Sequence, residues 1–269
     1  MTKERLALVA NSLQPVIIGR ATLYCGEALE VLRALPSASV DAVVTDPPYS
    51  SGGAYRGDRV ADTRQKYLQS DSGNVERLPN FGGDCRDQRA FHFWSALWSS
   101  EALRVAKPGA PACFFSDWRQ LPISTDYLQA GGWVWRGIVP WAKTSARPQK
   151  GRFSAQCEYV VWGSSGGMPV ERDVGCLPGF FRYGVPRERE HVAQKPEELM
   201  ADIIEVCTPG GKLLDKFMGS GTTGVAAVRS GRTFVGCEQQ PDLFAVACRR
   251  IAEAQGIAWD GASLHPASA

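Results

Sequence analysis

The sequence has few residues of the kinds that bind metal ions. Only three histidines occur in 269 residues, and their positions lack the spacing of metal-ligand pairs. The eight cysteines include no Cys-x-x-Cys pair, which argues against a zinc site. Cysteines scattered in this way are typical of free thiols in a reducing compartment. We therefore expect a cytoplasmic protein that holds no metal ion.

Long apolar runs and a strong net charge are also missing. The sequence contains no run of eighteen apolar residues, so we expect no transmembrane helix, and the apolar stretch after residues 1–5 is too short for a secretory signal. The formal net charge is only +2, so contact with nucleic acid would require a local basic surface. With 44% hydrophobic residues, the chain predicts a single globular domain over residues 1–269.

Strand-like and helix-like segments alternate along the chain. Strands are predicted at residues 21–25, 40–45, 110–116, 133–141, 158–162, 212–215 and 233–237. Helices are predicted at residues 28–35, 89–106, 120–129, 196–207, 222–230 and 241–255. This alternation predicts an α/β fold, a doubly wound and mostly parallel sheet with helices on both faces.

The segment Asp46-Pro47-Pro48-Tyr49 directly follows the predicted buried strand 40–45. Two prolines stop a strand and hold a rigid turn at its carboxyl end, which is the edge where open α/β sheets bind ligands. The turn offers a carboxylate, backbone carbonyls and an aromatic face, which suit an exocyclic amino group on a planar base. A strand-ending turn with a packed tyrosine is the alternative interpretation.

A second segment, residues 217–224, is rich in glycine and lies between the predicted strand 212–215 and a predicted helix. Glycine lets the backbone turn sharply and approach a ligand closely. The next strand, 233–237, ends at Glu238, an acidic residue placed to accept hydrogen bonds from a ribose diol. Taken alone, this pattern fits a nicotinamide, a flavin or an S-adenosylmethionine cofactor.

Together the two segments resemble the amino-group DNA methyltransferases, which methylate adenine N6 or cytosine N4 with S-adenosylmethionine. The Asp-Pro-Pro-Tyr segment precedes the glycine-rich segment, an order that resembles the permuted β class of this family. Further segments resemble the family in the expected order, namely residues 24–28, 141–143, 152–153, 158–162 and 191–196. The chain departs from the family pattern at Glu27, where aspartate is usual, and at Lys216, where proline is frequent.

The resemblance implies a Rossmann-like methyltransferase fold and a role for each matching residue. A flipped base would stack on Tyr49, and the Asp46 carboxylate and Pro47 carbonyl would accept its two amino hydrogens. Asp215 would face the methionine amino group, and Lys195 would hold the methionine carboxylate or the adjacent loop. The implied catalytic residues are Asp46, Pro47, Pro48 and Tyr49, and the implied cofactor residues are Glu27, Ala28, Asp46, Lys195, Asp215, Phe217, Gly219, Ser220, Gly221, Thr222 and Glu238.

Two long segments without predicted helices or strands complete the organisation. Residues 50–88 are polar and follow the predicted base pocket, so we interpret them as a mobile loop that closes over the base. Residues 163–190 are interpreted as a short target-recognition insert, too short for an elaborate recognition sequence. Within it, residues 180–183 interleave aromatics with arginine, which suits either stacking on bases or a hydrophobic patch that holds the loop down.

Basic residues cluster near these segments and predict contact with double-stranded DNA. The expected DNA-binding residues are Lys143, Arg147, Lys150, Arg152, Arg182 and Arg187. The alternative is ordinary charge on a solvated loop, the commoner origin of such runs. A homodimer is expected, because one subunit offers little surface to hold a duplex and β-class relatives are often dimeric.

Adenine N6 is the favoured target, because aspartate at the first position of the motif resembles the adenine enzymes, with cytosine N4 as the nearest alternative. More distant alternatives are a nicotinamide-dependent oxidoreductase and a nucleic-acid-binding protein without catalysis. The chain has no nuclease motif, so it would act either alone or as the methylating half of a restriction–modification pair.

Overall fold

The computed structural model describes residues 13–50, 86–144, 150–186, 188–190, 193–259 and 261. Within these residues the strands form one nine-stranded sheet in the order β1-β2-β9-β8-β3-β4-β6-β5-β7. The strands are β1 (Val16–Ile18), β2 (Ala21–Cys25), β3 (Ala42–Thr45), β4 (Pro111–Ser116), β5 (Val134–Lys143), β6 (Cys157–Ser164), β7 (Phe181–Tyr183), β8 (Lys212–Asp215) and β9 (Thr233–Glu238).

The sheet is mostly parallel. Strands β2, β9, β8, β3 and β4 pair in parallel, and β7 pairs in parallel with β5. Only β1 and β6 run antiparallel to their neighbours among the described strands. The helices are α2 (Ala28–Ala34), α5 (Gln88–Val105), α6 (Leu121–Ala130), α7 (Glu197–Ile204), α8 (Thr222–Arg229) and α9 (Pro241–Glu253).

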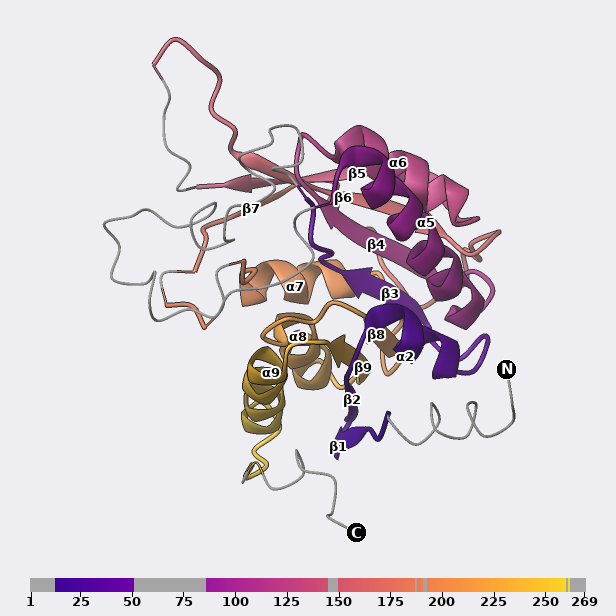
Figure 1. The fold of residues 1–269 in the computed structure, drawn as a ribbon, viewed down its shortest axis with the longest axis vertical. Coiled ribbons are helices and arrows are strands. Elements are labelled where there is room, and N and C mark those ends of the chain that lie inside the picture. Colours follow the sequence, from indigo (N-terminus) through magenta and orange to yellow (C-terminus); the bar gives the residue numbers. More distant parts are fainter. Residues whose placement is uncertain are drawn as a thin grey trace.

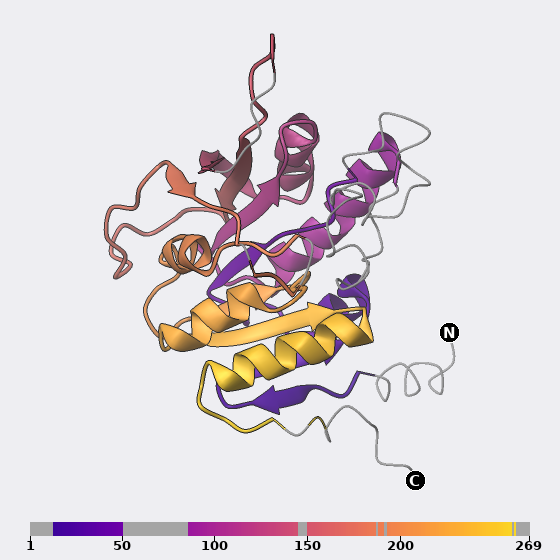
Figure 2. The same ribbon diagram turned by 90° about the vertical axis from the view of Figure 1, so that its left-hand side faces the viewer.

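The helices cover both faces of the sheet (Figures 1 and 2). One hydrophobic core lies between the sheet and α7, α8 and α9, and a second lies between the sheet and α2, α5 and α6. The side chains of β3 divide between them, since Ala42 and Val44 belong to the first core and Val43 to the second. Burial on both faces explains why the central strands are continuous apolar runs. The predicted doubly wound α/β fold is confirmed.

The carboxyl ends of β3 and β8 lie side by side, because these two strands pair in parallel in the middle of the sheet. From β3 the chain continues toward β4, whereas from β8 it continues through α8 to β9 on the other side. Such a reversal opens a crevice above the strand ends, where α/β proteins bind their ligands. The fold therefore brings residues 46–49 and 216–221 to one place.

Two short strands, β1 and β7, were not expected from the sequence. Strand β7 lies inside the predicted insert 163–190, where Phe181 is buried in the first core and the Tyr183 hydroxyl donates to Asp202. Of the two interpretations of residues 180–183, Phe181 fits the hydrophobic patch that holds the loop down, because it packs inside the protein. Phe180 remains half-exposed and Arg182 is exposed.

Several predictions concern residues outside the described ranges. Residues 51–85 of the predicted mobile loop, and the predicted DNA contacts Arg147 and Arg187, belong to this group.

Helix α5 begins at Gln88, where the Asp87 side chain accepts a hydrogen bond from Ala90 N at 3.2 Å. In the described part of the chain, no helix is long and apolar enough to cross a membrane.

Candidate active site

The two predicted segments border one cavity of about 340 Å³ at the carboxyl ends of β3, β8 and β9. Most of the predicted catalytic and cofactor residues line it: Glu27, Ala28, Asp46, Pro47, Pro48, Tyr49, Lys195, Asp215, Phe217, Gly219, Ser220, Thr222 and Glu238. The fold thus joins residues that are separated by up to 211 positions in the sequence, from Glu27 to Glu238. Gly221 is the one predicted member of this set that does not line the cavity.

Asp46 is the centre of a buried network of charges. Its carboxylate accepts hydrogen bonds from the Tyr49 hydroxyl and from Lys195 Nζ. Lys195 Nζ also lies 3.4 Å from Glu158 Oε2, and Glu158 forms a second ion pair with Lys143. Within this network carboxylates and ammonium groups alternate, and each of the four charges has a partner of opposite sign.

The network sets the protonation states of its members. Burial alone would lower the pKa of Lys195, but the carboxylates of Asp46 and Glu158 reverse this and raise it. Burial pushes the pKa of Glu158 upward, but Lys195 and Lys143 outweigh it and leave that pKa lowered. Burial raises the pKa of Asp46, an effect that the charge of Lys195 opposes. Lys195 is thus held as a cation beside Asp46.

This geometry changes the interpretation of two lysines. Lys195, expected to hold the methionine carboxylate or the adjacent loop, binds the Asp46 carboxylate in the structure. Lys143, expected to contact DNA, is paired with Glu158 in the cavity wall. The remaining described basic residues of that prediction, Lys150, Arg152 and Arg182, are exposed.

Asp215 joins three elements at the end of β8. Its Oδ1 atom accepts hydrogen bonds from Thr45 Oγ1 of β3 at 2.7 Å and from Phe217 N at 3.1 Å, and its Oδ2 atom accepts one from Thr223 Oγ1 of α8 at 2.6 Å. Burial raises the pKa of the Asp215 carboxyl. Because a carboxylate oxygen has two lone pairs, Oδ2 retains the capacity to accept a hydrogen bond from a ligand in the cavity.

Glu238 holds the glycine-rich segment against the tip of β9. Its Oε2 atom accepts a hydrogen bond from Gly219 N at 3.1 Å, and its Oε1 atom accepts one from Gln240 N at 2.9 Å. Burial raises the pKa of the Glu238 carboxyl. Each oxygen keeps a second lone pair, so Glu238 can accept further hydrogen bonds from the cavity that it lines.

Gly221 lies where the glycine-rich segment packs against α9. Its φ of +82° lies in the left-handed region that favours glycine. A Cβ atom there would lie 3.0 Å from Ala247 Cβ and 3.2 Å from Ile251 Cδ1, both on α9. Gly221 therefore allows α9 to pack closely against the glycine-rich segment.

Glu27, the departure from the family's aspartate, begins helix α2. Its Oε2 atom accepts hydrogen bonds from Leu29 N at 2.7 Å and from Glu30 N at 3.2 Å, so the side chain acts as the N-cap. Glu27 and Ala28 both line the cavity, as expected. The longer side chain therefore still reaches the first turn of the helix.

Sequence reasoning missed Glu158 as part of the site. Its partners Tyr49 and Lys195 are 109 and 37 positions away, so no local pattern indicates the contact. The only signal was its place in the segment 158–162, which resembles a family strand. Arg86 and Trp94 were also missed, and both line the cavity.

Lys216, the second departure from the family pattern, is buried beside aromatic side chains of the second core and also lines the cavity. Its Nζ atom lies 3.9 Å from the ring centroid of Trp98 and 4.6 Å from that of Phe114. Among the described residues it has no hydrogen-bond partner. Burial away from water disfavours the charged form and lowers the pKa of Lys216 well below its ordinary value, although the nearby Asp215 carboxylate opposes this. This side chain therefore costs stability whenever it is protonated in the folded state.

We expect Lys216→Met to stabilise the protein, and most strongly at low pH. The folded state has the lower lysine pKa, so it binds fewer protons than the unfolded chain between the two values, and stability rises with pH across that window. The window ends near the ordinary lysine pKa of about 10.4. Chemical unfolding of both proteins across the pH range measures the difference, which should shrink as pH rises.

The matched control for this experiment is Lys212→Met, at an exposed position on the same strand β8. It should leave the free energy of unfolding almost unchanged at every pH. A gain in stability from Lys216→Met that stays constant with pH would contradict the assignment of its cause to the buried charge.

The fold and the cavity together define a class of protein. A mostly parallel sheet with this strand order, a glycine-rich segment after β8 and an acidic residue at the tip of β9 form a Rossmann-like methyltransferase fold. The crystal structure of the M1.HpyAVI–SAM complex has the same fold, with a TM-score of 0.61 and 23% identity, covering 86% of this chain and 98% of that one. The cytosine-N4-specific PvuII DNA methyltransferase matches with a TM-score of 0.64 and 18% identity, covering 86% of each chain.

The sequence comparison identifies the family. The N6_N4_Mtase family, described as DNA methylase, matches residues 40–174 and 180–249. The chain therefore belongs to the amino-group DNA methyltransferases, the N6-adenine and N4-cytosine type. It is 28% identical to the type II methyltransferase M.Cfr9I of Citrobacter freundii over 274 residues, which cover 88% of this chain and 90% of that protein.

Proposed function

We propose that this protein transfers a methyl group from S-adenosylmethionine to the exocyclic amino group of a flipped base in double-stranded DNA, with adenine N6 as the target. The observation that carries this proposal is the position of Asp46. Its carboxylate lines the same cavity as the glycine-rich segment and is held by Lys195 and Tyr49. A hydrogen-bond acceptor is thereby fixed next to the space for a cofactor.

The cavity suits S-adenosylmethionine in charge and shape. Three carboxylates, those of Glu27, Asp215 and Glu238, line the part of the wall around the glycine-rich segment, and this cofactor carries a sulfonium and an ammonium group. Asp215 Oδ2 would accept from the ammonium group, and Glu238 would accept from the ribose hydroxyls. The Phe217 ring offers a flat face for the adenine. When bound, the cofactor supplies an electrophilic methyl group.

The residues around Asp46 would hold the base. Flipping a base out of the duplex costs a few kcal/mol, which stacking on Tyr49 and hydrogen bonding would offset. The Asp46 carboxylate and the Pro47 carbonyl would accept hydrogen bonds from the two amino hydrogens. These contacts would direct the nitrogen lone pair toward the cofactor side of the cavity. Preorganised carboxylates also stabilise the positive charge that develops on the amino nitrogen.

Lys195 and Glu158 support this arrangement without touching the amino group. The ammonium group of Lys195 fixes one oxygen of Asp46, and the Tyr49 hydroxyl fixes the other. Glu158 in turn holds Lys195 and accepts a long hydrogen bond from the Tyr49 hydroxyl, at 3.3 Å. The acceptor and the stacking face therefore move as one unit, which favours a single orientation of the base.

Contact with the DNA backbone would come from exposed basic residues beside the cavity. Lys150, Arg152 and Arg182 are exposed in the structure, and Arg147 and Arg187 belong to the same proposal. The chain would act as a cytoplasmic homodimer with a short recognition site, because the insert 163–190 offers few side chains for base contacts. Cytosine N4 is the alternative target, since both bases present an amino group beside a ring nitrogen.

Calorimetric binding of S-adenosylmethionine tests the cofactor site, with Glu238→Gln as the variant. The amide would place a donor against either Gly219 N or Gln240 N, so the glycine-rich segment would lose support and the ribose an acceptor. We expect roughly ten- to hundredfold weaker binding, equivalent to about 1–3 kcal/mol for a buried polar group that loses its partner.

The control is Glu253→Gln on the surface of α9, which should bind the cofactor like the unaltered protein. Glu253 is mostly exposed and pairs only with Arg249 among the described residues. Unchanged affinity in Glu238→Gln, together with tight binding of a nicotinamide dinucleotide, would instead support an oxidoreductase.

A further inference from the structure

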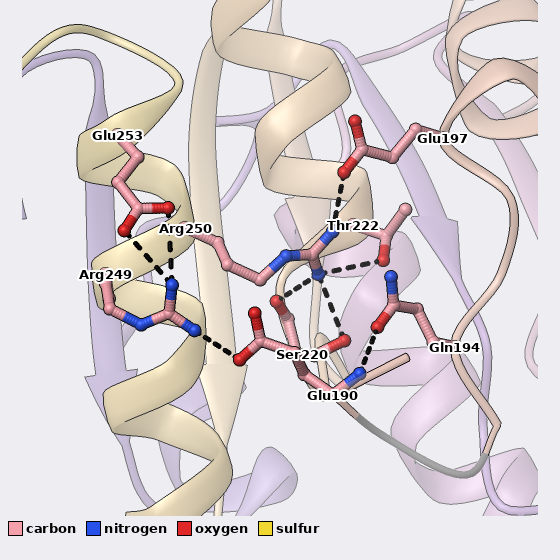
Figure 3. A network of polar contacts seen from close by, with 8 residues as sticks. All are labelled: Glu190, Gln194, Glu197, Ser220, Thr222, Arg249, Arg250 and Glu253. Carbon is pink, nitrogen blue, oxygen red and sulfur yellow. Dashed lines mark hydrogen bonds and ion pairs between the residues drawn. The ribbon is translucent and has the colours of Figure 1, made fainter. Parts of the chain in front are cut away.

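Arg250 of α9 contacts the glycine-rich segment from outside the cavity (Figure 3). Its Nη1 atom donates to the Ser220 carbonyl at 2.7 Å, to Ser220 Oγ at 3.1 Å and to Thr222 Oγ1 at 3.2 Å. Its Nη2 atom donates to Glu197 Oε1 at 2.7 Å. The arginine is buried and does not line the cavity, whereas Ser220 and Thr222 do.

The segment that Arg250 contacts is a tight turn, closed by a hydrogen bond from Gly221 N to the Met218 carbonyl at 2.7 Å. Gly219 and Gly221 both have positive φ, +51° and +82°, so the chain turns sharply on either side of Ser220. Gly221 is the N-cap of α8 but has no side chain to satisfy the free amide groups there. Arg250 adds to the backbone hydrogen bond of the turn by holding acceptors, namely the Ser220 carbonyl and the hydroxyls of Ser220 and Thr222.

The position of the Arg250 guanidinium is electrostatically unfavourable, which indicates that the hydrogen bonds it makes there are important. A helix N-terminus carries partial positive charge and disfavours a nearby cation, yet this guanidinium lies at the start of α8. Glu197, in the first turn of α7, supplies the opposite charge. A planar guanidinium can hold the turn with one nitrogen and Glu197 with the other, which a lysine cannot do.

The neighbouring Arg249 provides a natural comparison. It lies on the same helix but is half-exposed, and it pairs with Glu190 and Glu253 on the surface (Figure 3). Surface ion pairs of this kind contribute little to stability. Among the described residues, Arg249 forms no hydrogen bond or ion pair with the glycine-rich segment. The two arginines therefore separate the effect of charge on α9 from the effect of holding the turn.

We propose that Arg250 is a positioning residue for the cofactor. It holds the Ser220 carbonyl and the Ser220 and Thr222 hydroxyls in the arrangement that the cofactor requires, and so preorganises the wall of the cavity before binding. This rests on the assignment of the glycine-rich segment to S-adenosylmethionine under the proposed function. Arg250 acts through the segment and touches neither the base nor the cofactor.

The test compares Arg250→Met, Arg250→Lys and Arg249→Met in the full-length protein. Affinity for S-adenosylmethionine and S-adenosylhomocysteine is measured by calorimetry well below each variant's unfolding temperature. Arg250→Met should bind both about tenfold more weakly or worse, because a charged donor to the turn is lost. Arg250→Lys should fall between it and the unaltered protein, and Arg249→Met should stay within about twofold.

Steady-state kinetics separate positioning from general damage to the fold. Arg250→Met should raise KM for the cofactor while KM for DNA, and kcat at saturating cofactor, change much less. If Arg250→Met does not fold, Arg250→Lys and Glu197→Gln replace it. Both should raise KM for the cofactor more than they change KM for DNA or kcat, but by a smaller factor.

Unchanged cofactor affinity in every folded Arg250 and Glu197 variant would overturn the role of Arg250, as would equal weakening by Arg249→Met. Failure of the unaltered protein to bind S-adenosylmethionine would overturn the cofactor assignment itself. The two failures are therefore distinguishable by the first titration.

Discussion

Replacing Asp46 by alanine is expected to abolish methyl transfer to DNA while leaving affinity for S-adenosylmethionine within about twofold of the unaltered protein. The carboxylate is the acceptor proposed for the amino group. It follows the end of β3 and is held by Lys195 and Tyr49, whereas Asp215 and Glu238 hold the glycine-rich segment and its surroundings. Removing one preorganised electrostatic contact at a reacting centre lowers kcat by about 10²–10³-fold. Transfer of a labelled methyl group to DNA, alongside calorimetric cofactor binding, measures both quantities.

Two further variants make the Asp46 experiment specific. Asp46→Asn keeps the shape of the side chain but removes the charge beside Lys195, and it should also lose most activity. Asp41→Asn changes a carboxylate just before the same strand, where it pairs with Lys107 outside the cavity, and it should leave transfer intact. Methyl transfer by Asp46→Ala at a near-normal rate would contradict the assignment.

Lys195→Met is the second change with a large expected effect. Lys195 is buried against Asp46 and Glu158, so its removal leaves Asp46 without its cation and beside the Glu158 carboxylate, which keeps only Lys143 as a partner. Breaking a buried pair in this way destabilises a protein by about 3–5 kcal/mol. We expect kcat to fall by at least about tenfold, because Asp46 is no longer held in place, while affinity for the cofactor changes little.

The pH dependence of Lys195→Met separates positioning from loss of stability. Lys195 opposes the upward effect of burial on the pKa of Asp46, so without it the carboxyl should ionise only at higher pH. The acid limb of the pH–rate profile should therefore move to higher pH. Lys143→Met, which removes the outer partner of Glu158, should produce a smaller shift in the same direction.

The same variant distinguishes the two roles considered for Lys195. A strong loss of cofactor affinity, with normal kcat at saturating cofactor and no shift of the acid limb, would assign Lys195 to the methionine carboxylate. The observed ion pair with Asp46 predicts the opposite pattern, in which the rate and its pH dependence change and cofactor affinity does not.

The parts of this site that the sequence predicts are those built from local patterns. The run of apolar β-branched residues before Asp46 predicts where β3 ends to within a few residues. The glycines between Asp215 and the helix at 222–229 do the same for β8. The register of parallel strands then brings the strand ends together. Element positions were therefore predicted closely, with boundaries shifted by one to three residues.

The parts that the sequence could not predict depend on contacts between distant positions. The ion pair between Lys195 and Asp46 spans 149 positions, and a basic residue near a glycine-rich segment fits several roles until its partner is known. Lys143 looked like part of a basic loop for the same reason. At Gly221, the sequence alone could not tell whether a ligand or helix α9 requires the absence of a side chain.

Mass spectrometry of nucleosides from methylated DNA tests the central claim most directly. DNA would be incubated with the protein and S-adenosylmethionine that carries an isotope-labelled methyl group, then hydrolysed and compared with DNA treated with Asp46→Ala. We predict labelled N6-methyladenine with the unaltered protein and none with the variant. Label found only on a ring carbon of cytosine, or equal labelling by Asp46→Ala, would contradict methylation of a base amino group that depends on Asp46.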